Sequence, residues 1–172
     1  MTNSNRAIKT VSDDDIIRIS PSPTADTRSC DWSAVSKDQL CDSSVQHRSD
    51  VRKGFEFFRR MMQRQAELHD HDKLSDIDGF HADFQTGFEQ HEWWDRHRKI
   101  NRHHLLQEDG VPEDVNLIDV LDLIIDCTMA GLARSGDIYP ITLSPEVLQR
   151  AFDNTCELLK SHVVVEHTSE GR

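Results

Sequence analysis

Histidine is concentrated in one stretch of this 172-residue chain. Seven of its ten histidines lie between Leu68 and Leu105, and an eighth, His47, lies just upstream. The stretch opens with the tetrad His69-Asp70-His71-Asp72 and closes with two further histidine-rich blocks. Neutral imidazole and carboxylate are the usual protein ligands of zinc, iron, manganese and nickel. We therefore predict that this stretch, with one partner on each side, builds a metal centre inside a helical domain.

The overall composition narrows the classes of protein that fit. The net charge is -11, the hydrophobic content is 36% and the mean hydropathy is -0.63. These values predict one domain with a partly disordered tail and argue against a broad basic surface for nucleic acid. Between His47 and His104, however, eleven Lys/Arg balance eleven Asp/Glu, so an anionic substrate could approach this region.

Targeting and redox signals are absent from the sequence. No run of 18 apolar residues predicts a membrane span, and the N-terminus has no apolar signal region. The four cysteines show no CxxC spacing, which predicts free thiols in a reducing cytoplasm.

Hydrophobic periodicity predicts an all-α fold with no strand. Residues 1–43 read as a flexible acidic N-terminal arm, with a small packed N-terminal element as the alternative, and residues 44–172 as the helical metal-binding domain. The expected helices are 44–68, 74–90 with a weaker signal, 91–106, 114–133, and one that Ser144 caps and Pro145 begins, running to about 165. On the first helix the apolar face is expected to be Val51, Phe55, Phe58 and Met62, with His47 one turn earlier on that face.

Three carboxylates share one stripe of the helix predicted at 114–133. Asp119, Asp122 and Asp126 are spaced by three and four residues. For Asp119 we expect a place on a solvated acidic face, opposite apolar residues that include Leu121, Ile124 and Ile125. Asp126 is different, because long apolar runs flank it on both sides, and a buried carboxylate needs a partner or a metal.

The block at 93–104 carries the second concentration of ligands. His97, Asn101 and His104 fall on one face of the predicted helix, while His103 is about 100° away. At most two or three of these side chains can then reach one centre, and a merely His-rich surface helix is the alternative. Trp93 and Trp94 are expected to pack the helix or shield the site.

The adjacent His-Asp pair has two registers. His71-Asp72 and His69-Asp70 each place an imidazole next to a carboxylate, and a turn at a helix start is needed for both groups to bind one ion. A solvated turn without metal is the alternative for the whole tetrad.

The order of His47, a His-Asp pair, further histidines and Asp126 resembles the HD-domain superfamily of metal-dependent phosphohydrolases. More closely, the chain is similar to an uncharacterised HD-like family of phage and bacterial proteins over about residues 45–163. The pieces that match are His71-Asp72-Lys73-Leu74-Ser75, the block from Trp94 to His104, and Asp122-Leu-Ile-Ile-Asp126. The Lys-Leu-Ser that follows the pair favours the 71–72 register, although it permutes the Ser-Lys usual in the superfamily. The N-terminal 43 residues match nothing in it.

The resemblance implies an HD-like helical bundle with a mono- or dinuclear centre. His47, His71, Asp72 and Asp126 would hold one divalent ion (Mn, Fe, Zn, Mg, Ni or Co). His97, together with His103 or His104, would bind a second ion or a phosphate. Asp122 would orient a ligand or take a proton, and the candidates for phosphate contacts are Lys73, Arg96 and Arg102.

The expected function is hydrolysis of a nucleotide or related phosphate ester in the cytoplasm, that of a host if the chain is phage-encoded. A homo-oligomer is left open. One alternative is a non-catalytic helical protein that binds a partner, with a structural metal or none. A further alternative is a di-iron oxygenase, since a minority of HD-like proteins oxidise their substrates.

Overall fold

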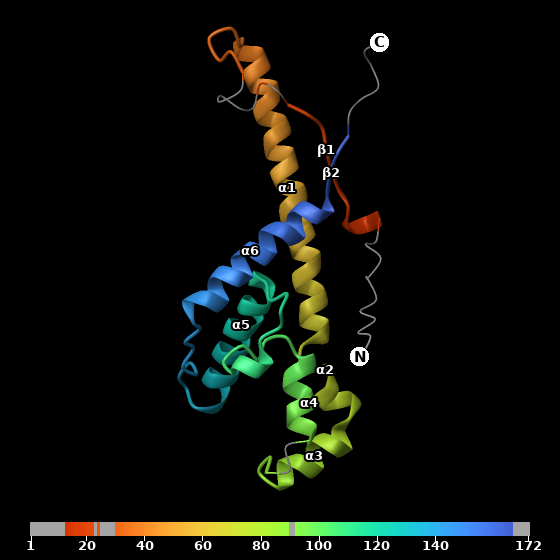
Figure 1. Ribbon diagram of the computed structural model, residues 1–172, viewed down its shortest axis with the longest axis vertical. Coiled ribbons are helices and arrows are strands. Elements are labelled where there is room, and N and C mark those ends of the chain that lie inside the picture. The colour runs from red at the N-terminus through yellow and green to blue at the C-terminus, as the bar shows by residue number, and fades with distance from the viewer. Residues whose placement is uncertain (1–12, 23, 25–29, 90–91, 167–172) are drawn as a thin grey trace, which may run out of the picture. The chain divides into compact units, whose positions relative to one another are not determined.

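The computed structural model describes residues 13–22, 24, 30–89 and 92–166. The described residues are mostly helical, which confirms the all-α prediction (Figure 1). The chain divides into two compact units, one formed by residues 1–58 with 159–172 and the other by residues 59–158. All four cysteines are free.

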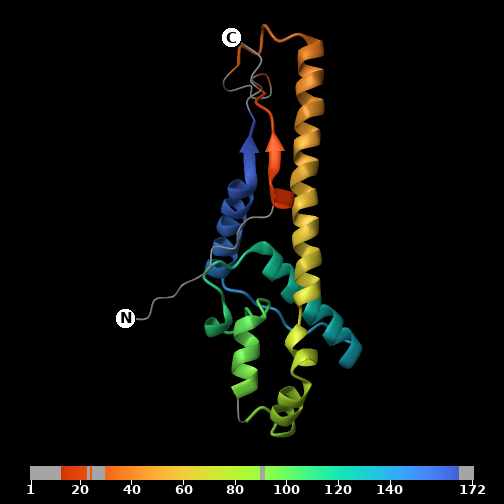
Figure 2. The same cartoon turned by 90° about the vertical axis from the view of Figure 1, so that its right-hand side faces the viewer.

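The first unit contains two short strands that the sequence analysis did not predict. Strand β1 (Ile17–Ile19) pairs in parallel with β2 (Val163–Val165), and Ile17 lies opposite Val163 (Figure 2). Both segments are rich in β-branched residues, which suit a pleated strand. A 3-10 turn, η1 (Asp13–Asp15), precedes β1. The described part of the predicted arm therefore contains a small packed element, and residues 1–12 lie outside the described residues.

Helix α1 (Lys37–Leu68) begins seven residues earlier than predicted. Within the first unit its Lys53 Nζ donates to the carbonyl oxygen of Arg18 at 2.6 Å, which ties β1 to the helix. The inward residue of this part of α1 is Phe57, which is fully buried against the rings of Phe58 and His162.

The predicted apolar face of α1 is largely exposed, so that prediction was wrong. Val51 has 44% of its surface exposed, Phe55 72% and Met62 42%. His47, which was expected to point inward with them, is exposed too. Periodicity identified residues on a common face but did not identify the face that packs.

The second unit holds the end of α1 and the remaining helices. They are α2 (His71–Ser75), α3 (Ile77–Gln85), α4 (Glu92–Ile100), the 3-10 turn η2 (Glu108–Gly110), α5 (Leu117–Arg134) and most of α6 (Pro145–His162). The Ser144 hydroxyl accepts a hydrogen bond from the Val147 N–H, which confirms the predicted cap of α6. Helix α6 ends before β2 instead of continuing to about residue 165.

Helix α5 forms the centre of the apolar core of the second unit. A capping box fixes its start: the Asn116 side-chain oxygen accepts from the Ile118 N–H, and the Asp119 carboxylate accepts from the Asn116 N–H. The core consists of Leu105, Val115, Val120, Leu123, Cys127 and Ala151. None of the helices described here combines the length with the apolar character that crossing a membrane requires.

Candidate metal centre

A tight turn after α1 directs His69 and Asp70 inward. Asp70 has φ of 53°, a left-handed conformation that Asp tolerates better than most residues. The turn leaves only 27% of the His69 side chain and 20% of the Asp70 side chain exposed. His71 is exposed, and its Nδ1 lies 2.8 Å from the Leu68 carbonyl oxygen. The preferred pair, His71-Asp72, was therefore wrong for His71. The side chains that face the other histidines are those of the competing pair, His69-Asp70.

Asp72 is buried and holds His97 in one tautomer. Both carboxylate oxygens lie 2.9 Å from His97 Nδ1, and Asn101 Nδ2 donates to Oδ1 at 2.8 Å. Burial alone would raise the pKa of Asp72, but the hydrogen bonds from Asn101 and His97 lower it overall. An ionised carboxylate only accepts, so the proton sits on His97 Nδ1 and the lone pair on Nε2.

The oxygen Asp70 Oδ1 is buried without a hydrogen-bond partner among the described residues, and so is His97 Nε2. These two atoms lie 3.4 Å apart, and Asp70 Oδ1 lies 3.6 Å from His103 Nε2. A tetrahedral ion with ligand bonds of about 2.1 Å has ligand-to-ligand edges of about 3.4 Å. A buried unpaired polar atom costs about 1–3 kcal/mol, so the spacing of these atoms fits an ion better than an empty core.

His103 and His104 lie in the turn that follows α4, not on the helix. Helix α4 ends at Ile100, six residues before the predicted end, so the prediction that both residues lie on this helix was wrong. His104 joins Asp70 and His103 in a group whose ligand atoms all lie within 4.8 Å of one another. Burial, aided by the neighbouring histidines, lowers the pKa of His104 to about 3, so its imidazole is neutral and able to bind a cation.

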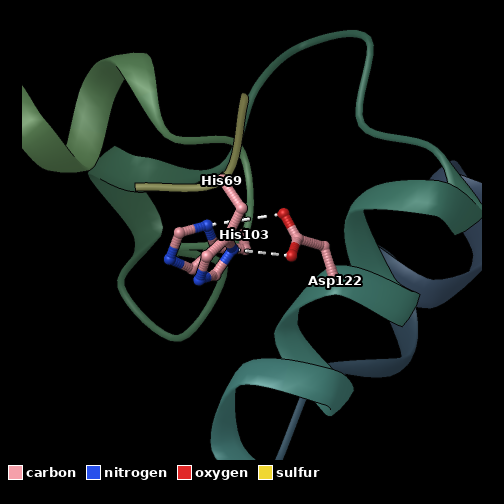
Figure 3. Close-up of side chains that lie close together, drawn as sticks. All are labelled: His69, His103 and Asp122. Carbon is pink, nitrogen blue, oxygen red and sulfur yellow. Dashed lines mark hydrogen bonds and ion pairs between the residues drawn. The ribbon is translucent and has the colours of Figure 1, made fainter. Parts of the chain in front are cut away.

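A second group of potential ligands shares His103. His69 and His103 face the same carboxylate, that of Asp122 (Figure 3), with His69 Nδ1 at 2.8 Å from Oδ1 and His103 Nδ1 at 3.5 Å from Oδ2. The two imidazole rings stack with centroids 4.3 Å apart. Burial would raise the pKa of Asp122, but His103, Gln65 and His69 together lower it. Asp122 is therefore an ionised member of the cluster.

Five predicted ligands lie outside both groups, namely His47, His71, Asp72, His97 and Asp126. His47 is exposed on α1, about six helical turns before the end of that helix, and belongs to the first unit. Asp126 is partly exposed, and its Oδ1 lies 3.8 Å from His69 Nε2. The expectation that Asp126 is buried was wrong, because one turn earlier Asp122 is the carboxylate that faces the histidines.

The three predicted phosphate-binding cations have different surroundings. Lys73 Nζ binds Asp70 Oδ2, which places its charge directly beside the candidate ligands. Arg96 is about half exposed and pairs with Asp76.

Arg102 has a structural partner. Its guanidinium donates two hydrogen bonds, of 2.7 and 2.8 Å, to Asp119, which is only 1% exposed. The prediction that Asp119 lies on a solvated face was therefore wrong, because Arg102 neutralises it inside the unit.

Aromatic rings cover one side of the cluster, as predicted. Trp93 and Trp94 both stack on the His97 ring, with centroids 4.8 and 5.2 Å away. The sequence analysis missed Asp83, a buried carboxylate of α3 that accepts the Trp94 backbone N–H at 3.0 Å and so fixes the start of α4. No spacing signal in the sequence distinguished Asp83 from its exposed neighbours.

No protein-family model, no curated protein and no solved structure matches this chain. The resemblance to the HD superfamily stays a prediction, and the site is assigned from geometry alone. Each of the two groups combines one carboxylate with two imidazoles, a donor set suited to zinc, iron, manganese, nickel or cobalt. Magnesium, which prefers oxygen ligands and retained water, fits this set poorly.

Proposed function

We propose that the protein is a metal-dependent phosphohydrolase whose divalent ion is held by Asp70, His103 and His104, with His97, which lies beside Asp70, as a fourth ligand. The observation that carries the proposal is the buried, unpartnered Asp70 Oδ1, which lies 3.4 Å from the equally unpartnered His97 Nε2. When bound, the ion supplies a water of lowered pKa and a positive charge for phosphate oxygens.

The surrounding residues then have separable roles. Asp72 orients His97 through its Nδ1–H, and Asp122 orients His69 in the same way. Lys73 supplies a cation beside the ligands for a phosphate oxygen. His69 and Asp122, which share His103 with the first group, offer a second metal position or a proton acceptor for the attacking water. Arg96 is a weaker candidate for phosphate contact, and Arg102 is assigned a structural role.

The substrate class follows from the resemblance and from the local charge. A phosphate ester needs a dication and at least one further cation near its reacting oxygens. Lys73 meets this need, and an ion bound by one carboxylate and neutral imidazoles keeps a net positive charge. We therefore infer a nucleotide or related phosphate ester as the substrate.

Metal analysis and phosphate release test the proposal together. The full chain is purified, dialysed and analysed for bound transition metals, and phosphate release from nucleoside mono- and triphosphates and cyclic dinucleotides is then measured with manganese. We expect one or two ions per chain and turnover of at least one substrate class. Asp70→Asn should abolish turnover while leaving the helical circular dichroism unchanged.

A matched histidine variant controls for loose binding to a His-rich chain. His81 is exposed on α3 and outside both ligand groups, so His81→Ala should keep metal content and turnover. Bound metal without phosphate release from any substrate would contradict the hydrolase assignment. Absence of metal, with unchanged stability in chelator, would instead favour the non-catalytic partner-binding alternative.

A further inference from the structure

An open cavity of about 300 Å³ adjoins the histidine cluster within the second unit. The end of α1 and one side of α5 line it, and its walls are mostly apolar, including Met62, Ala66, Leu121, Ile125 and Met129. Cavities of this size with apolar walls and a few placed polar groups are typical of sites for small organic ligands.

The polar end of the cavity offers hydrogen-bond acceptors. Gln65 donates its amide N–H to Asp122 at 2.7 Å, which leaves the amide oxygen of Gln65 as an acceptor. The two carboxylate oxygens of Asp122 already accept hydrogen bonds from Gln65 and His69. Asp126 accepts no hydrogen bond from the described residues, although its carboxylate lies at the wall of the cavity.

The charge of the lining selects the kind of ligand. Neither Lys nor Arg occurs among the described residues that line the cavity, so a phosphate group placed there would meet carboxylates and no cation. A ligand with a flat apolar body and an N–H donor is complementary to the walls and to Asp126. Since the Asp126 carboxylate can only accept, a carbonyl oxygen at the same position would be repelled.

We propose that this cavity binds the base of the nucleotide substrate and selects bases with an exocyclic amino group, which donates to Asp126. This inference rests on the proposed function, because it assumes that the substrate is a nucleotide. His69 lies both in the wall of the cavity and in the ligand group with His103 and Asp122. A base in the cavity is therefore adjacent to the proposed centre, while its phosphates would lie with the ion and Lys73.

Adenosine and purine riboside form a matched pair of probes, since they differ only in the exocyclic amino group, which a hydrogen atom replaces in purine riboside. Binding of each to the full chain is measured by calorimetry in the presence of chelator, so that neither metal nor turnover is needed. We expect adenosine to bind about 10-fold or more tightly than purine riboside, because purine riboside lacks the donor for the Asp126 carboxylate. A protein that hydrolyses no phosphate ester could therefore still prefer adenosine in this measurement. Equal binding of the two nucleosides would count against the cavity proposal without counting against the hydrolase.

Variants of α5 separate the cavity from the rest of the surface. Ile125 and its neighbour Ile124 are both about half exposed, at 52% and 42%, but only Ile125 lines the cavity. Ile125→Ser should weaken adenosine binding several-fold, whereas Ile124→Ser should leave it unchanged. Asp126→Asn, which presents an N–H as well as an oxygen, should reduce the preference for adenosine to less than about three-fold.

Three results would overturn the proposal. The first is equal binding of adenosine and purine riboside, and the second is equal effects of the two isoleucine variants. The third is absence of nucleoside binding together with self-association that Ile125→Ser and Ile124→Ser both disrupt, which would make this apolar face a contact between copies of the chain.

Discussion

Four aspartates of the second unit that are wholly or mostly buried have four different partners. Asp70 faces imidazole nitrogens, Asp72 orients His97, Asp119 pairs with Arg102, and Asp122 receives Gln65 and His69. Burial by itself would raise the pKa of Asp70, Asp72 and Asp122, but the groups around each carboxylate lower it overall. Within the described part of the chain, Asp70 Oδ1 is the one buried oxygen of these four carboxylates that has no hydrogen-bond partner, which makes it the candidate to bind a cation.

Asp72 is predicted to act on the metal through His97. Asp72→Asn keeps the size of the side chain but removes the obligate acceptor for the His97 Nδ1–H. We expect metal affinity to fall about 10–100-fold with helical content unchanged. Calorimetric titration of the metal-free protein with zinc measures the affinity. An unchanged affinity would mean that Asp72 does not orient a ligand.

Arg102 is predicted to stabilise the fold. Arg102→Met leaves the Asp119 carboxylate buried without its two hydrogen bonds and should lower the free energy of unfolding by about 3–5 kcal/mol. Urea denaturation measures the change. Combining it with Asp119→Leu should recover a large part of the loss, because the uncompensated charge is then removed. A loss that the second change does not reduce would argue against the pair.

At the scale of elements, the turn that follows α4 positions two of the proposed ligands. A Cβ atom on Gly110 would lie 2.3 Å from the His104 carbonyl oxygen, so the chain reaches this arrangement only with glycine there. Gly54, within α1, has open space around the position of its absent Cβ. The two glycines therefore differ in what their substitution does.

Alanine at these two positions should shift stability in opposite directions. Gly54→Ala should raise the free energy of unfolding by about 0.5–1 kcal/mol, because alanine favours the helix. Gly110→Ala should lower it and also weaken zinc binding, because the clash displaces His104. Thermal unfolding and zinc titration of both variants make the comparison. Equal effects would contradict the described packing of the turn.

The sequence predicted the helices better than the directions in which they face. Spacing correctly placed Asp119 and Asp122 on one stripe of α5, but the stripe faces inward, leaving Leu121 40% exposed. The stripe faces inward because Arg102 binds Asp119 and His69 binds Asp122. Both partners lie outside α5, so the periodicity of α5 does not reveal them.

The histidine cluster was predictable in composition but not in register. Density of His and Asp identified Asp70, His97, His103 and His104 as candidates before any coordinates. The choice between His69 and His71 depended on a single left-handed residue, Asp70, and a sequence does not reveal such a turn. The separation of His47 from the cluster follows from the uninterrupted length of α1, which periodicity alone did not require.

At the scale of the whole molecule, the metal-free protein should be sensitive to mild acid. Burial lowers the pKa of His97 and His104 below the ordinary value of about 6.5, to about 3 for His104. Between pH 6.5 and the lowered pKa values, these two histidines take up protons in the unfolded chain but not in the folded protein. Stability is thus present above pH 6.5 and is lost as the pH falls, by up to about 1.4 kcal/mol per pH unit for each histidine.

Urea denaturation in chelator at pH 7, 6 and 5 measures this dependence. The carboxylates with lowered pKa values, Asp70, Asp72 and Asp122, lose their contribution only below about pH 3.8, so the chosen range reports on histidine. His104→Gln should reduce the slope. A stability that is constant from pH 7 to pH 5 would show that these imidazoles are not buried in their neutral form.

The central claim, that buried imidazoles and the Asp70 carboxylate surround one cation, is tested most directly by zinc titration of three forms of the metal-stripped full chain. These are the unaltered protein, His97→Ala and His71→Ala, the last removing an exposed histidine from the same segment. We predict tight binding by the unaltered protein and by His71→Ala, and at least about 100-fold weaker binding by His97→Ala. Equal affinities in all three forms, or no binding by the unaltered protein, would contradict the claim.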